Sequence, residues 1–342
     1  MPTSPLQLDL RDSGGRGLRL AVALALATRT PVRLSNVRAS HRRPGLLRRH
    51  VAALQAAATL SRGEVEGATV GSQDVAFRPG AIDGGEFDLR LGAGAPIVPL
   101  LRTILPAMLV TASCGEPTTA TLHGATFAPD ATTVLGWQQA VLPVLRSIGA
   151  DVDVDVEQDG AFPRGDGRVV IRARPVDELR PIELASRGAL QSLVAAVHLA
   201  GLPFTIAKRE VAALRAAFGD ASLDVLPRQH PDALGRMNAI TIAAESERAT
   251  DAFATFGHLG RRAESVADAA AKQARQYLAT DAAVGSGTFD ELLPFLALAG
   301  GRLSTLRLHP RARAACALAA AFPCHRVSLE DAAGKTLLAV AG

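Results

Sequence analysis

Segments with strand-like and helix-like patterns alternate along most of this chain, and this alternation restricts it to an α/β fold. Side-chain direction repeats every two residues in a strand and every 3.6 residues in a helix, so one segment cannot satisfy both periods. The first part of the chain contains β candidates at 7–10, 31–37, 74–78 and 87–91 and helix candidates at 18–27 and 45–60.

The dipeptide Leu-Pro recurs inside helix-like segments, at Leu105-Pro106, Leu142-Pro143 and Leu293-Pro294. Proline kinks or starts a helix, so each copy places a similar irregularity beside glycine-containing turns and strand-like stretches. We therefore predict repeated units of a sheet plus two helices, although the spacing of the copies is uneven.

Residues 183–280 have a different sequence pattern, since their own Leu-Pro pairs fall between helical patterns rather than inside them. This stretch contains helix candidates at 206–218 and 263–278, a strand at 239–244 and an irregular segment at 227–231. We predict that residues 1–182 and 281–342 form one domain, interrupted by an inserted small α/β domain at 183–280.

Composition supports a packed core, with 48% hydrophobic and 20% charged residues. Aromatic residues make up only 4%, so a row of rings that stacks RNA bases is not expected. Three scattered cysteines, Cys114, Cys316 and Cys324, are too few for a disulfide framework. The apolar run 20–27 is too short to cross a membrane. We expect no membrane association and a cytoplasmic location.

Positive charge is concentrated near the N-terminus, although the net charge of the chain is only +4. Seven arginines and no acidic residue lie between Arg29 and Arg49. Such a block can neutralise phosphates. The alternative is a solvated helix face in an arginine-rich protein.

The segment Asn36–His50 reads Asn-Val-Arg-Ala-Ser-His-Arg-Arg-Pro-Gly-Leu-Leu-Arg-Arg-His. Its Pro-Gly-Leu sets a turn into a helix, where backbone N–H groups beside Arg38, Arg42 and Arg43 would make an anion site. Alternatively, the turn only caps a helix, with its charges in water. The segment resembles the signature of the RNA 3'-terminal phosphate cyclase family. Other stretches resemble that family in the same order, including Phe77–Gly80, Gly160–Gly167 and Asp290–Gly300, so the resemblance covers nearly the whole chain.

This resemblance implies a ligase that consumes ATP and acts on RNA 3' ends. In the family, a histidine attacks ATP and becomes adenylylated, AMP passes to the RNA 3'-phosphate, and the 2'-hydroxyl displaces AMP to leave a 2',3'-cyclic phosphate. A divalent metal, Mg²⁺ or Mn²⁺, supports the charge at phosphorus. The family's position for the nucleophile corresponds to His309, although a lone histidine before proline is usually a surface residue.

The resemblance also implies the remaining site residues. It places Asp12 as a metal ligand, Asp12 and Asp290 at the nucleotide, and Arg38, Arg42, Arg43 and His50 at the substrate phosphate. The other nucleotide-binding positions that it implies are Gly14, Gly15, Arg16, Phe162 and Pro163.

Several positions depart from the family pattern. Asp12 replaces a Glu, and arginine replaces glutamine at Arg16, Arg49 and Arg102. Arginine retains phosphate affinity but loses the fixed geometry of an amide. The alternative function is therefore a catalytically impaired homologue that binds RNA or nucleotide without turnover. The same fold class includes enolpyruvyl transferases, so a transferase of small anionic metabolites is a third hypothesis. The sequence leaves the oligomeric state open.

Overall fold

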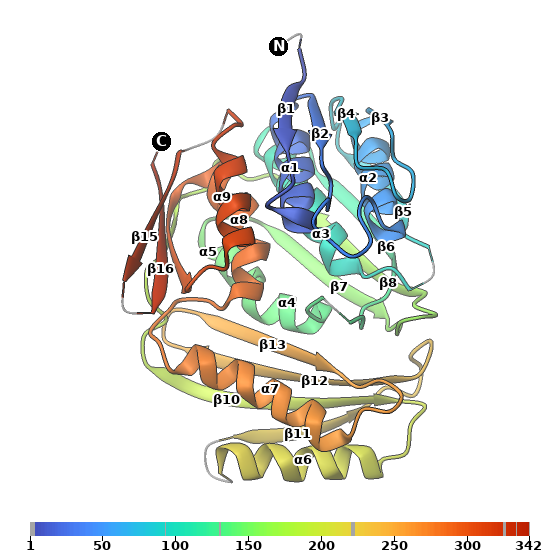
Figure 1. Cartoon of the computed structure of the whole chain (residues 1–342), viewed down its shortest axis with the longest axis vertical. Coiled ribbons are helices and arrows are strands. Elements are labelled where there is room, and N and C mark those ends of the chain that lie inside the picture. The colour runs from blue at the N-terminus through green and yellow to red at the C-terminus, as the bar shows by residue number, and fades with distance from the viewer. Residues whose placement is uncertain are drawn as a thin grey trace.

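The computed structural model describes residues 4–92, 94–129, 131–219, 223–323, 326–332 and 334–341, so Cys324 lies outside the described residues. These residues form four sheets of four strands each (Figure 1). Three of the sheets belong to units with one shared topology. Each unit runs strand, helix, parallel strand, helix and then an antiparallel hairpin.

The first unit contains β1 (Leu6–Asp9), α1 (Gly14–Thr28), β2 (Val32–Ser35), α2 (Arg48–Ser61), β3 (Glu64–Glu66) and β4 (Val75–Arg78). The second contains β5 (Gly85–Arg90), α3 (Ile97–Ser113), β6 (Thr118–Gly124), α4 (Val134–Ala140), α5 (Leu142–Ser147), β7 (Val152–Gln158) and β8 (Gly167–Ala173). The third contains β9 (Ile182–Leu184), α8 (Ser286–Ala299), β14 (Gly301–Leu306), α9 (Pro310–Ala319), β15 (Arg326–Ala332) and β16 (Lys335–Ala341).

The strand orders β1-β2-β4-β3, β5-β6-β8-β7 and β9-β14-β16-β15 match one another, so the predicted repeat is confirmed. Pro106 and Pro294 lie in α3 and α8, the first helices of the second and third units. Pro143 instead lies in the first turn of α5, so it starts a helix rather than kinking one. Proline is tolerated there because it lacks an N–H, and the first N–H groups of a helix have no partner within the helix.

Between β9 and α8 the chain forms a fourth sheet, with order β11-β10-β12-β13. We call residues 190–278 the insert. Its elements are β10 (Leu190–Ala200), α6 (Thr205–Phe218), β11 (Asp224–Gln229), β12 (Met237–Ser246), β13 (Thr250–Phe256) and α7 (Ala263–Leu278). Helices α6 and α7 share a separate apolar core with this sheet, and α4 of the second unit also contacts β12 and β13. The predicted domain boundaries at 183 and 280 stay a prediction.

One sequence expectation within the insert was wrong. Residues 227–231 were expected to be irregular, but Asp224–Gln229 form β11. This strand pairs with β10 at the edge of the sheet, where a proline such as Pro227 is tolerated.

The three units share one apolar core around α1. Helix α1 is buried on nearly all sides and contacts α3, α8 and α9. Such a helix is typical of the centre of a globular protein. Among the described residues, no helix combines the length and the apolar character that crossing a bilayer requires.

A buried carboxylate joins the insert to the third unit. Asp251 of β13 is 1% exposed and accepts hydrogen bonds from the amide of Gly285 and the hydroxyl of Thr288, where α8 begins. Gly285 has no side chain with which to cap this helix, so Asp251 caps it from another element. Burial raises the pKa of Asp251 to about 6. The edge strand β13 is thereby held against the start of α8.

Glu210 generates a stability prediction for the insert. It is fully buried on α6, where its Oε2 accepts a hydrogen bond of 2.9 Å from the Asn238 amide, and burial raises its pKa to about 7. At pH values between the pKa of Glu210 in the unfolded chain and its raised pKa in the native state, Glu210 is protonated in the native state but ionised in the unfolded chain. Stability therefore falls as pH rises through this window.

The variant Glu210→Gln cannot ionise and should escape this loss. We expect its thermal unfolding midpoint to match the native protein near pH 4.5 and to exceed it at pH 8, by the equivalent of roughly 2 kcal/mol. Circular dichroism melts at both pH values measure the difference. An offset independent of pH would contradict the burial argument.

Candidate functional site

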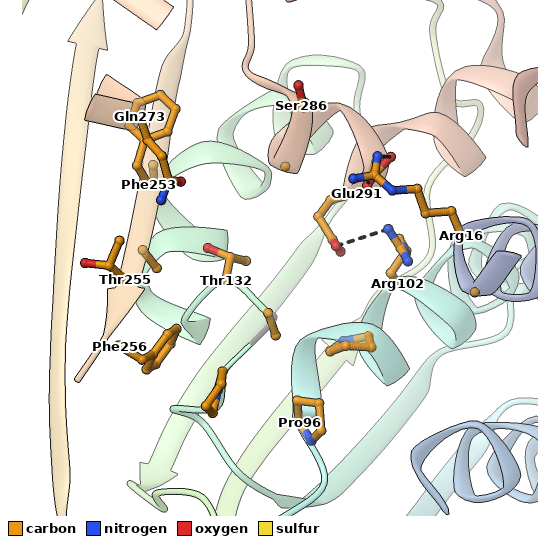
Figure 2. Close-up of a pocket in the computed structure, with 18 of the residues that line it drawn as sticks. Arg16, Pro96, Arg102, Thr132, Phe253, Thr255, Phe256, Gln273, Ser286 and Glu291 are labelled. Atoms are coloured by element: carbon orange, nitrogen blue, oxygen red, sulfur yellow. Dashed lines mark hydrogen bonds and ion pairs between the residues drawn. The ribbon is translucent and has the colours of Figure 1, made fainter. Parts of the chain in front are cut away.

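A cavity of about 960 Å³ lies between the insert and the three units, and Figure 2 shows part of its lining. Among the described residues, the lining includes seven arginines but only three carboxylates. The carboxylates are those of Asp251, Asp290 and Glu291. A pocket with this excess of guanidinium groups attracts a polyanion.

Six of these arginines come from the repeated units, and we call them the arginine wall. They are Arg16, Arg19, Arg38, Arg49, Arg102 and Arg311.

Two ion pairs connect the first helices of the three units. Arg16 of α1 lies 2.7 Å from Asp290 of α8, and Arg102 of α3 lies 3.3 Å from Glu291 (Figure 2). Burial raises the pKa of both carboxyl groups, and the neighbouring arginines oppose that shift. Burial also lowers the pKa of Arg19 to about 9, with Arg102 adding repulsion.

Some polar atoms in this network are left for a ligand or water. The Nε atoms of Arg19 and Arg102 and the Oε2 atom of Glu291 are buried without a hydrogen-bond partner among the described residues. Because buried polar atoms are normally satisfied, these atoms indicate that the cavity binds polar groups.

The basic loop before α2 turns one arginine inward. Arg38 has φ of 53° and is 8% exposed, and its Nη1 donates a 2.8 Å hydrogen bond to the carbonyl of Gly45. Leu46 is bound to the neighbouring loop, because its amide donates to Ser72 and its carbonyl accepts from Gly71. The guanidinium of Arg38 is therefore held in place at the cavity. Burial lowers its pKa, with a contribution from Arg49.

Two histidines contact the start of α1. Gly14 has φ of +57°, and a Cβ atom there would lie 2.8 Å from Cε1 of His41, so a side chain would be both strained and obstructed. His50 is 3% exposed, and its Nδ1 accepts a 3.2 Å hydrogen bond from the amide of Leu47. Burial, with help from Arg19, lowers the pKa of His50 to about 3. The ring is thus neutral at neutral pH, with its proton assigned to Nε2.

His309 is the N-cap residue directly before α9, outside the cavity lining. Its exposed ring accepts a 3.3 Å hydrogen bond at Nδ1 from the amide of Arg311. The neighbouring residues Leu306 and Arg311 do line the cavity. The charge of Arg311 helps to lower the pKa of His41, after the larger contributions of burial and Arg38, so α9 begins close to the basic loop.

The structure brings together about half of the predicted site residues. Gly15, Arg16, Arg38, His50 and Asp290 line the cavity, and Gly14 lies directly under His41. The others are exposed and lie outside the lining: Asp12, Arg42, Arg43, Phe162, Pro163 and His309.

The described residues offer no prepared cage for a metal ion. No group of three or more His, Cys, Asp or Glu side chains among them is arranged to bind one. Asp12 is exposed, and Asp290 and Glu291 already face arginines. The donor set therefore does not fit a resident metal, and no chemical step below depends on one. The metal role of Asp12 stays a prediction.

Sequence reasoning assigned no role to several lining residues. Arg102 carried a usable signal, because a single charge in the apolar segment 97–113 is either paired or functional. Phe256 and Gln273 of the insert carried none, since neither belongs to a charged or glycine-rich motif.

Comparisons with known proteins identify the family of this chain. The family profile described as RNA 3'-terminal phosphate cyclase matches residues 10–328. A protein of that name from Ectopseudomonas mendocina (strain ymp) is 36% identical over 300 residues, which are 86% of each chain. Another, from Salmonella typhimurium (strain LT2), is 36% identical over 293 residues, or 84% of each chain. This chain therefore belongs to the RNA 3'-terminal phosphate cyclase family.

Proposed function

We propose that this protein uses ATP to convert the 3'-terminal phosphate of RNA into a 2',3'-cyclic phosphate, with His309 as the adenylylated nucleophile. The arginine wall is the observation that supports this function best, because both substrates present several phosphates. The names of the relatives support the same reaction.

The proposed reaction has three balanced steps. An imidazole nitrogen of His309 attacks the α-phosphorus of ATP and pyrophosphate leaves, while the other ring nitrogen keeps its proton, so that the ring departs as neutral imidazole when the bond is later cleaved. The RNA 3'-phosphate then attacks the same phosphorus, which frees the histidine. Finally, the 2'-hydroxyl attacks the RNA phosphorus, its proton is lost, and AMP leaves.

The ring of His309 must rearrange before Nε2 can attack. Because Nδ1 accepts from the Arg311 amide, the neutral ring carries its proton on Nε2. Attack by Nε2 requires the proton to move to Nδ1, which breaks that contact. At 3.3 Å the contact is long for a hydrogen bond, so its loss costs little.

The cavity residues supply phosphate binding in this proposal. The Arg38 guanidinium is already oriented by Gly45, and preorganised cations stabilise developing negative charge with little rearrangement. His50 adds a neutral N–H donor. Arg16 and Arg102 are partly neutralised by Asp290 and Glu291, so they orient phosphates more than they attract them.

A binding protein without turnover is the second candidate. Its support is the exposed position of His309 outside the cavity lining. In that case the arginine wall would bind RNA or nucleotide, and no covalent intermediate would form.

The first test is covalent labelling by ATP with label in the α-phosphate. We expect an acid-labile, base-stable protein–AMP adduct that His309→Ala reduces by at least about 10³-fold, since the nucleophile is removed. His123→Ala is a matched control, because that half-buried histidine of β6 pairs with Asp88 and lies outside the cavity lining. If the native protein binds RNA but forms no adduct, the non-catalytic alternative is correct.

The second test measures the arginine wall through salt dependence. Arg49→Ala should weaken binding of a 3'-phosphorylated RNA and reduce the slope of log K against log salt by about 1, because one phosphate contact is lost. Arg33→Ala removes the same charge from an exposed position on β2, outside the cavity. Equal slopes for the two variants would show that the cavity is not the phosphate site.

A further inference from the structure

The cavity has two chemically different sides. The side opposite the arginine wall belongs to the insert and is formed by Ala252–Gly257 of the β13 segment together with Ala269, Gln273 and Gln276 of α7. We call these residues the insert wall; none of them carries a charge, whereas Asp251, His258 and Arg261 of the insert border it and also line the cavity. Figure 2 shows Phe253, Thr255, Phe256 and Gln273 on the opposite side of the space from Arg16 and Arg102.

One stripe of α7 contributes hydrogen-bonding groups to the insert wall. Ala269, Gln273 and Gln276 are spaced by four and three residues, so they lie on the same face of the helix. Both glutamine side chains are exposed. An amide supplies both a donor and an acceptor, which are the groups needed to pair with the edge of a nucleobase.

Strand β13 contributes backbone groups because it is the edge strand of its sheet. The amide of Gly257 donates to the carbonyl of Asn238. In an antiparallel pair every second residue makes such bonds, so the alternate residues of β13 do not bond to β12. Ala252, Ala254 and Phe256 therefore direct their N–H and C=O groups away from β12. The carbonyl of Phe256 accepts from Arg261, and the amide of Ala252 donates to Asp251.

Phe256 is the aromatic ring of this wall that a ligand can reach. Phe253 is 8% exposed, and its ring centroid lies 5.3 Å from that of Tyr277, so it belongs to the core of the insert. Phe256 is half-buried at the end of β13. Stacking on one half-buried ring needs no aromatic row, which the low aromatic content did not lead us to expect.

We propose that the insert wall binds the nucleobase of the 3'-terminal nucleotide of RNA, by stacking on Phe256 and hydrogen bonding to Gln273 and the free edge of β13. This proposal rests on the proposed function and adds a base-recognition subsite to it. The stretch 251–258 lines the cavity without interruption and spans roughly 25 Å at the rise of a β-strand. That length exceeds one nucleotide and fits a continuing RNA strand better than a single ATP.

The test compares two RNAs that end in a 3'-phosphate and differ only in whether the terminal ribose carries a base. The native protein should bind the complete RNA at least about tenfold more tightly, as stacking on an aromatic ring predicts. Phe256→Leu, which keeps apolar bulk, and Gln273→Ala should each reduce this preference severalfold. Gln191→Ala is the control, because it removes an exposed amide from β10 outside the cavity.

Any of three results would overturn the subsite. The first is equal binding of both RNAs by the native protein. The second is full preference for the complete RNA in both variants, and the third is a raised KM for ATP in the variants with an unchanged RNA preference. Formation of cyclic phosphate is measured separately on the same samples. If no cyclic product forms but the base preference is present and lost in the variants, the catalytic proposal fails and the subsite stands.

Discussion

Two adjacent carboxylates at the meeting point of three helices constrain this whole structure. Asp290 and Glu291 lie on α8, while their cationic neighbours Arg16 and Arg102 come from α1 and α3. Each helix is the first helix of its unit, so the charges of one unit are compensated by the other two. Removing one partner of the buried Arg102–Glu291 pair leaves an isolated charge, which is far more costly than losing a surface contact. The same ion pairs therefore determine both the packing of the three units and the shape of the cavity.

The sequence predicted the elements whose patterns are local. Residues 263–278 were expected to form a helix, and α7 has these bounds, because its apolar residues keep a regular helical spacing. Strands β10 and β13 were not identified. β10 is largely buried and β13 lacks a clean alternation, so neither shows the periodicity that marks a half-exposed strand. The repeat itself was predicted from prolines, yet the shared strand order that proves it depends on pairings between distant segments.

The candidate site shows the same division between local and distant information. The basic segment was predicted to bind phosphate, and two of its arginines, Arg38 and Arg49, do line the cavity. Arg42 and Arg43 face solvent instead. The difference arises from left-handed backbone at Asn36 and Arg38, which the sequence does not reveal because neither residue is a glycine. The insert wall could not be predicted at all, since its residues are uncharged and become relevant only when β13 is placed opposite the arginines.

The position of the insert within the repeat has an evolutionary consequence. In each unit the start of the first helix borders the cavity, through Ser13 before α1, Pro96 before α3 and Ser286 at the beginning of α8. In the third unit the connection from the first strand to this helix has expanded into a folded module. The two ion pairs that join the three units involve no residue of the module. Recombination that exchanges the module between relatives could therefore change substrate choice while the three units stay unaltered.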